Sequence, residues 1–149
     1  MTIESSWRTA KTILVPTDGS EASLEALAVA CDLAKRNKGK VYALYVIEVP
    51  RSLPLDAEIV SEAQKGEAIL ARAEKVADEL DFEVESEIIQ SREAGHAIVD
   101  EAESQRVDLI VMGVEAGSRG RFELGRSAQY VLKNALCEVW LRRRPAAEG

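Results

Sequence analysis

Short apolar runs rich in β-branched residues alternate with longer segments of helical periodicity along this chain. The apolar runs predict five strands, at residues 11–15, 41–47, 82–89, 107–112 and 137–142. Apolar residues recur at helical spacing in four intervening segments, 21–36, 56–80, 94–105 and 127–135. Gly66 predicts an interruption of the long second helix. The alternating strand at 82–89 is typical of a position near a sheet edge.

The regular alternation of strands and helices predicts the fold class. Such a pattern indicates βαβ units with right-handed crossovers, and hence a parallel sheet covered by helices on both faces. We therefore expect an α/β fold, a Rossmann-like three-layer α/β/α sandwich. Ligands of these sheets bind beyond the carboxyl ends of the strands, where the winding direction changes. Here those ends are Pro16-Thr17-Asp18, Val46-Ile47-Glu48 and Met112-Gly113.

Composition narrows the classes of protein to consider. The 149 residues predict one domain with a core at about 9–143, and 46% apolar with 30% charged residues is a globular composition. A net charge of −7 argues against a nucleic-acid partner. No apolar run approaches the roughly 20 residues that span a bilayer, and the first ten residues lack a secretory apolar core. We expect no membrane insertion and a cytoplasmic location.

A glycine-rich, basic segment lies between the fourth strand and the last helix. Residues 113–127 contain Gly113, Gly117, Gly120 and Gly125, and also Arg119, Arg121 and Arg126. A loop of this kind between a strand and a helix presents backbone N–H groups to an anion, and the helix dipole favours negative charge there. The segment predicts a phosphate site; a solvated loop that balances a negative surface is the alternative.

Three further features occur together with this loop and point to a family. They are the turn Val15-Pro16-Thr17-Asp18-Gly19-Ser20, the strand end Tyr45-Val46-Ile47-Glu48, and Asp108-Leu109-Ile110-Val111-Met112-Gly113 with the closing Ala135-Leu136-Cys137-Glu138-Val139. The combination resembles the universal stress protein family over about residues 9–143. The resemblance implies a five-stranded parallel sheet of order 3-2-1-4-5 and a homodimer formed through the last strand, residues 137–142.

Many members of that family bind ATP, so the resemblance also implies a nucleotide site. ATP, with or without Mg²⁺, is the first expected ligand, and another adenine nucleotide is the alternative. Asp18 would lie near the adenine or ribose, while Pro16 and Thr17 shape its turn and the backbone of Val46 contacts adenine. The phosphate loop would be formed by Met112, Gly113, Gly117, Gly125, Arg126 and Ser127.

The sequence departs from the family's ATP-binding pattern within that loop. Ala116 stands where a second glycine is expected, and the interval from Gly113 to Gly125 is one residue shorter than in the pattern. Arg126 occupies the place of a serine or threonine, and the hydroxyl follows at Ser127. An arginine is a stronger, bidentate phosphate donor than a hydroxyl. The same Gly-Arg-Ser variant resembles stress-protein domains attached to membrane transporters.

Three functions remain open from the sequence. The favoured one is a dimeric stress-response or regulatory protein, in which bound nucleotide orders residues 114–126 for an unknown protein partner. The second is a dimerising module with an empty or non-ATP pocket. The third is a weak ATP-hydrolysing enzyme, although no general base stands out. His96 is interpreted as a helix-start residue, and Glu83, Glu85 and Glu87 are interpreted as a solvent-exposed face of a strand. Trp140 fits packing at a dimer interface or beneath a covering helix equally well.

Overall fold

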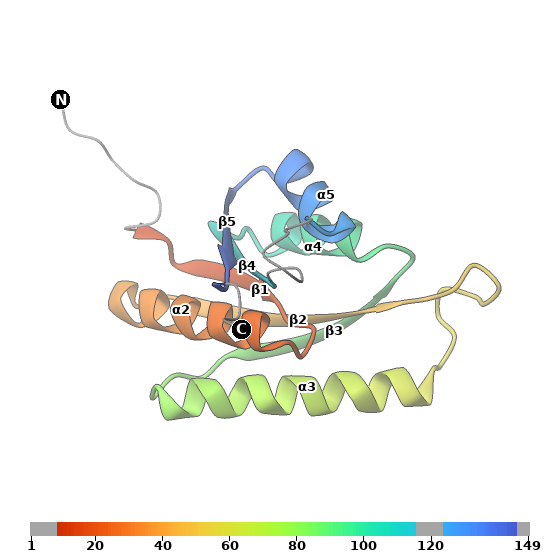
Figure 1. Cartoon of the computed structure of the whole chain (residues 1–149), viewed down its shortest axis with the longest axis horizontal. Coiled ribbons are helices and arrows are strands. Elements are labelled where there is room, and N and C mark those ends of the chain that lie inside the picture. The colour runs from red at the N-terminus through yellow and green to blue at the C-terminus, as the bar shows by residue number, and fades with distance from the viewer. Residues whose placement is uncertain (1–8, 116–123, 146–149) are drawn as a thin grey trace.

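The computed structural model describes residues 9–115 and 124–145. Five parallel strands form one sheet in the order β3-β2-β1-β4-β5, as predicted (Figure 1). The strands are β1 Thr12–Pro16, β2 Lys40–Glu48, β3 Glu85–Ser91, β4 Leu109–Val114 and β5 Glu138–Arg143. The helices are α2 Glu21–Asn37, α3 Val60–Glu79, α4 Ala94–Ser104 and α5 Arg126–Asn134. The predicted α/β/α class is therefore confirmed.

Two apolar layers enclose the sheet. Helices α2 and α3 lie on one face and α4 and α5 on the other (Figure 1). Alternate residues of β1 serve the two layers, since Ile13 and Val15 belong to the α2–α3 side and Leu14 to the opposite one. All three are fully buried. Because both faces of β1 are covered, its sequence is a continuous apolar run and not an alternating one. None of the helices within the described ranges has both the length and the apolarity to cross a membrane.

The second helix begins later than its periodicity predicts. α3 starts at Val60 rather than at residue 56, because the chain turns at Pro54, whose carbonyl accepts a hydrogen bond from the Ala57 N–H at 3.0 Å. The predicted interruption at Gly66 is wrong, since the helix continues through that residue. Gly66 is buried, and a Cβ there would lie 2.5 Å from Cδ1 of Tyr45. Its small size thus lets α3 approach β2.

The structure also corrects the start of the third strand and places Trp140. β3 begins at Glu85 rather than at residue 82, because Asp81 turns the chain with φ +55° and the Phe82 N–H still bonds back to Ala77 of α3. Trp140 is partly buried against the core on the α2–α3 side. This contact favours the covering-helix interpretation of Trp140.

We expect Gly66→Val to lower the free energy of unfolding by about 2–3 kcal/mol, because the new side chain displaces the buried Tyr45 ring. Glu67→Val places the same residue on the exposed side of α3 and should change stability by less than about 1 kcal/mol. Urea unfolding of both variants measures the difference. Equal losses would mean that β-branching in the helix, and not the Tyr45 contact, limits this position.

Glu87 differs from the solvated carboxylate that the sequence predicted. The side chain is half-buried between β3 and α4, where Gln105 Nε2 donates to its Oε1 at 3.3 Å. Burial, followed by the neighbouring carboxylates of Glu101 and Glu85, raises the pKa of Glu87 to about 7. The folded chain therefore holds the Glu87 proton more tightly than the unfolded chain does.

This raised pKa predicts a pH-dependent effect of Glu87→Gln. The wild type loses stability as pH rises from about 4.5 to about 7, because the folded state must then bury a charge. The variant should match the wild type near pH 4 and exceed its free energy of unfolding above pH 7 by about 1 kcal/mol, a value reduced by solvent screening. Urea unfolding across this pH range tests the prediction, and a constant difference would contradict it. Glu83→Gln, on the exposed side of the chain, is the control.

Candidate functional site

A cleft opens beyond the carboxyl ends of β1 and β4, between which the winding direction of the sheet changes. Its volume is about 910 Å³, which is sufficient for a nucleotide-sized ligand. Residues from the strand ends and from the first turns of α4 and α5 line it. Six of the predicted binding residues lie on its walls: Asp18, Met112, Gly113, Gly125, Arg126 and Ser127.

Three other predicted site residues, Pro16, Thr17 and Val46, do not line this cleft. Thr17 is 3% exposed; its N–H donates to the Leu44 carbonyl at 2.8 Å and its Oγ1 donates to the Val15 carbonyl at 3.0 Å. These bonds fix the end of β1, which Pro16 completes. Val46 packs against the core on the α4–α5 side. The backbone contact of Val46 to adenine stays a prediction, and Gly117 lies outside the described residues.

Asp18 combines a turn role with a place in the cleft. Its Oδ1 accepts a hydrogen bond from the Ser20 N–H at 2.9 Å, which stabilises the turn into α2. Burial raises the pKa of Asp18, but hydrogen bonds from Ser20 and Ser23 act in the opposite direction and bring the pKa below its ordinary value. The side chain is therefore an ionised acceptor at neutral pH, as a contact to a hydroxyl group requires.

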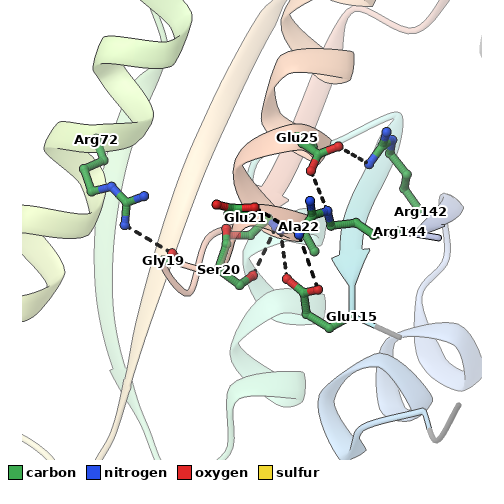
Figure 2. Close-up of polar contacts among 10 residues, drawn as sticks. Gly19, Ser20, Glu21, Ala22, Glu25, Arg72, Glu115, Arg142 and Arg144 are labelled. Carbon is green, nitrogen blue, oxygen red and sulfur yellow. Dashed lines mark hydrogen bonds and ion pairs between the residues drawn. The ribbon is translucent and has the colours of Figure 1, made fainter. Parts of the chain in front are cut away.

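Three helices begin at the cleft, and two of their N-termini receive a glutamate from elsewhere in the chain. At α2, Oε1 of Glu115 accepts a hydrogen bond from the Ala22 N–H at 3.2 Å (Figure 2). At α4, Oε2 of Glu48 accepts one from the Ala94 N–H at 3.1 Å. A carboxylate is favoured at such a position by the free N–H groups and by the helix dipole.

The N-terminus of α5 is different. Gly125 is its N-cap residue and has no side chain with which to satisfy the first N–H groups. A Cβ built on Gly125 would find no atom within 4 Å among its described surroundings, so no described residue fills the space beside this helix start in the cleft. Arg126 and Ser127 follow in the first turn and also line the cleft. The arrangement provides backbone donors, a hydroxyl and a guanidinium to an anion.

Gly113 has a structural requirement that Gly125 lacks. A Cβ at Gly113 would lie 2.0 Å from the carbonyl oxygen of Ala22, so only glycine lets β4 pass this close to the first turn of α2. This approach places Glu115, two residues further along, against the N-terminus of α2. Of the predicted loop glycines, Gly113 is thus needed for packing, whereas Gly125 leaves space beside the helix start.

The structure adds His96 to the walls of the cleft, whereas the sequence predicted only that it stands at a helix start. His96 lies in the first turn of α4, as predicted, and also lines the cleft. Its ring stacks on Tyr130 of α5 with centroids 4.0 Å apart, and its Nε2 lies 2.8 Å from a carboxylate oxygen of Glu93. The sequence feature that accompanies this stacking is the glycine before His96. A Cβ at Gly95 would lie 2.8 Å from Cβ of Tyr130, so the glycine lets α4 and α5 approach each other.

The charge on the walls is mainly negative. Four carboxylates and two permanent cations line the cleft among the described residues: Asp18, Glu48, Glu93, Glu115, Arg126 and Lys133. No cluster of three or more histidine, cysteine or acidic residues in the described parts of the chain has the arrangement of a metal site. The described donors that could offset this negative charge for an anion are those at the start of α5.

The fold and cleft define a doubly wound α/β protein with a cleft at its switch point, into which a helix start without a side-chain cap opens. Comparison with known proteins then identifies the family, because the model of the universal stress protein family matches residues 9–143. The chain belongs to the universal stress protein family. A universal stress protein of Methanocaldococcus jannaschii is 39% identical over 146 residues, covering 93% of this chain and 85% of the relative. One from Thermus aquaticus is 34% identical and covers 89% and 98%.

Solved structures of the family share the fold. A universal stress protein from Archaeoglobus fulgidus in complex with dAMP superposes with a TM-score of 0.73 at 18% identity, covering 89% of this chain and 98% of that one. A family member from Arabidopsis thaliana with AMP bound gives a TM-score of 0.68 at 21% identity, with 91% and 93% covered. The sheet order and the layering of this chain are thus those of its family.

Proposed function

We propose that this chain is a regulatory protein that binds an adenine nucleotide, ATP or a nucleotide with fewer phosphates, in the cleft. The observation that carries the proposal is the start of α5, which opens into the cleft without a side-chain cap and beside Arg126 and Ser127. Two proteins of the same fold have dAMP and AMP bound. Adenine nucleotides occur in the cytoplasm, and we include the predicted cytoplasmic location of this chain in the proposal.

The polar groups suggest how the ligand is oriented. A phosphate at the α5 N-terminus accepts hydrogen bonds from the first backbone N–H groups, and Arg126 contributes positive charge. The ribose then faces the end of β1, where the ionised Asp18 accepts a hydrogen bond from a hydroxyl group. With ATP, a Mg²⁺ ion bound to the phosphates reduces repulsion from the carboxylates on the walls.

The action we propose is binding rather than turnover. Bound nucleotide favours one state of the protein, and a protein partner recognises that state or the dimer. The ordering that the sequence predicts for residues 114–126 concerns mainly residues 116–123, which lie outside the described residues. Nucleotide can shift the equilibrium between the recognised and the unrecognised state only to the extent that it binds one state more tightly than the other.

The position of β5 at the end of the sheet supports the homodimer that the family resemblance implied. β5 pairs with β4 on one side, and no described strand pairs with its other side. Leu136, two residues before β5, is 85% exposed. An exposed apolar residue close to an edge strand favours association with a second copy. We therefore propose that residues 137–142 form the dimer interface.

Gly125→Asp tests the proposed phosphate position, because it should weaken nucleotide binding without lowering the stability of the fold. The aspartate has room and is a better N-cap than glycine, so the free energy of unfolding should stay equal or rise by a few tenths of a kcal/mol. Its carboxylate occupies the place of the phosphate, so AMP affinity should fall about tenfold or more.

Gly125→Asn is the matched control, because it has the same shape without the charge and caps about as well. It should weaken AMP binding by less than about threefold in calorimetric titrations. Unchanged affinity in the aspartate variant would place the phosphate elsewhere. Equal loss in both variants would show that side-chain bulk, not charge, disturbs the site.

Leu136→Glu tests the proposed dimer. Because the side chain is 85% exposed in the single chain, the substitution should leave the unfolding curve of a monomeric sample nearly unchanged. A charge at the interface should raise the dimer dissociation constant about tenfold or more in sedimentation equilibrium. Leu53→Glu, at an exposed leucine far from β5 in sequence, is the control and should not alter association. A wild type that stays monomeric would refute the dimer.

A further inference from the structure

The Glu115 carboxylate lies at the N-terminus of α2, beside the cleft. Its Oε1 accepts a hydrogen bond from the backbone N–H of Ala22, and the Ser20 hydroxyl accepts one from the Ser23 N–H. These two acceptors satisfy two N–H groups in the first turn of α2 with groups from the protein itself. Glu115 and the open start of α5 line the same cleft. A ligand that fills the α5 position therefore finds the α2 position already taken by a carboxylate.

Among the described residues, Glu115 has one ion-pair partner, and it shares that partner with other acids. Its Oε2 lies 3.7 Å from Nη1 of Arg144, but that guanidinium is closer to two other acids, 2.6 Å from Glu25 and 3.1 Å from Glu21 (Figure 2). Arg142 pairs with Glu25 at 3.1 Å. In the described part of the chain this network contains three carboxylates and two guanidinium groups, and Glu115 has the longest ion pair in it.

Each phosphate beyond the first changes the balance of interactions in the cleft. The first phosphate binds the uncapped N–H groups of α5. At the start of α2, a second or third phosphate finds the N–H groups of Ala22 and Ser23 already bonded, and it adds negative charge to the cleft that Glu115 lines. We propose that the Glu115 carboxylate makes this cleft selective for adenine nucleotides with one phosphate group over ATP. This inference rests on the proposed nucleotide site and names Glu115 as its specificity-determining residue.

The test compares AMP with ATP in calorimetric titrations at pH 8, low ionic strength and with EDTA present, so that no divalent cation screens the phosphates. Under these conditions AMP has about two negative charges and ATP about four. The wild type should bind AMP at least about fivefold more tightly than ATP. Glu115→Gln keeps an oxygen for the Ala22 N–H but removes the charge, so it should improve ATP binding about three- to fivefold and AMP binding less than twofold.

Two further variants isolate the effect of position and charge. Glu21→Gln removes one charge from the same ion-pair network, but Glu21 does not line the cleft and should leave the AMP-to-ATP ratio unchanged. Glu115→Asp keeps the charge and should keep the AMP preference. Urea unfolding of each variant verifies that α2 stays folded.

The possible outcomes separate this inference from the proposed function. If neither nucleotide binds the wild type, the proposed function fails and the inference with it. If both bind but ATP is equal or tighter, charges other than Glu115 govern selectivity and only the inference is overturned. The same holds if Glu115→Gln and Glu21→Gln shift the ratio equally, because the effect would then follow net charge. A shift confined to Glu115→Gln supports the assignment.

Discussion

The need to satisfy the first N–H groups of each helix governs the chemistry of this molecule. In a parallel sheet with right-handed crossovers, the helices that follow the strands begin at the same edge, and each begins with unpaired donors. Here α2 receives Ser20 and Glu115, and α4 receives Glu48. The start of α5 receives no side chain from its N-cap residue, Gly125. The site that we propose is therefore the one helix start at the cleft whose described capping residue leaves room for an anion.

Close packing of backbone against backbone creates this arrangement. β1 and β4 are buried by apolar layers on both sides, which fixes their carboxyl ends relative to each other. Gly113 then lets β4 pass the first turn of α2 at a distance that any Cβ would prevent. Glu115 reaches the Ala22 N–H as a result of that approach. The packing of the core and the electrostatics of the cleft are thus parts of the same geometry.

The sequence predicted the fold and much of the cleft because both follow from local patterns. Continuous apolar runs identified the buried strands, and parallel strands necessarily bring their carboxyl ends, with Asp18 and Gly113, to one edge. The capping glutamates had no local signal. Glu115 is 93 residues from Ala22 and Glu48 is 46 residues from Ala94, so only the folded chain brings each pair together. The same reason explains Gly66, whose place opposite Tyr45 is a tertiary contact.

The claim on which the account depends is that the α5 N-terminus holds a phosphate group. The most direct measurement is a titration of ¹⁵N-labelled protein with AMP and, separately, with adenosine, following the backbone amide signals of Arg126, Ser127 and Ala128. The account predicts large shifts of these signals with AMP and small shifts with adenosine, because only AMP supplies the anion. AMP-induced shifts that leave these three amides unchanged would contradict it.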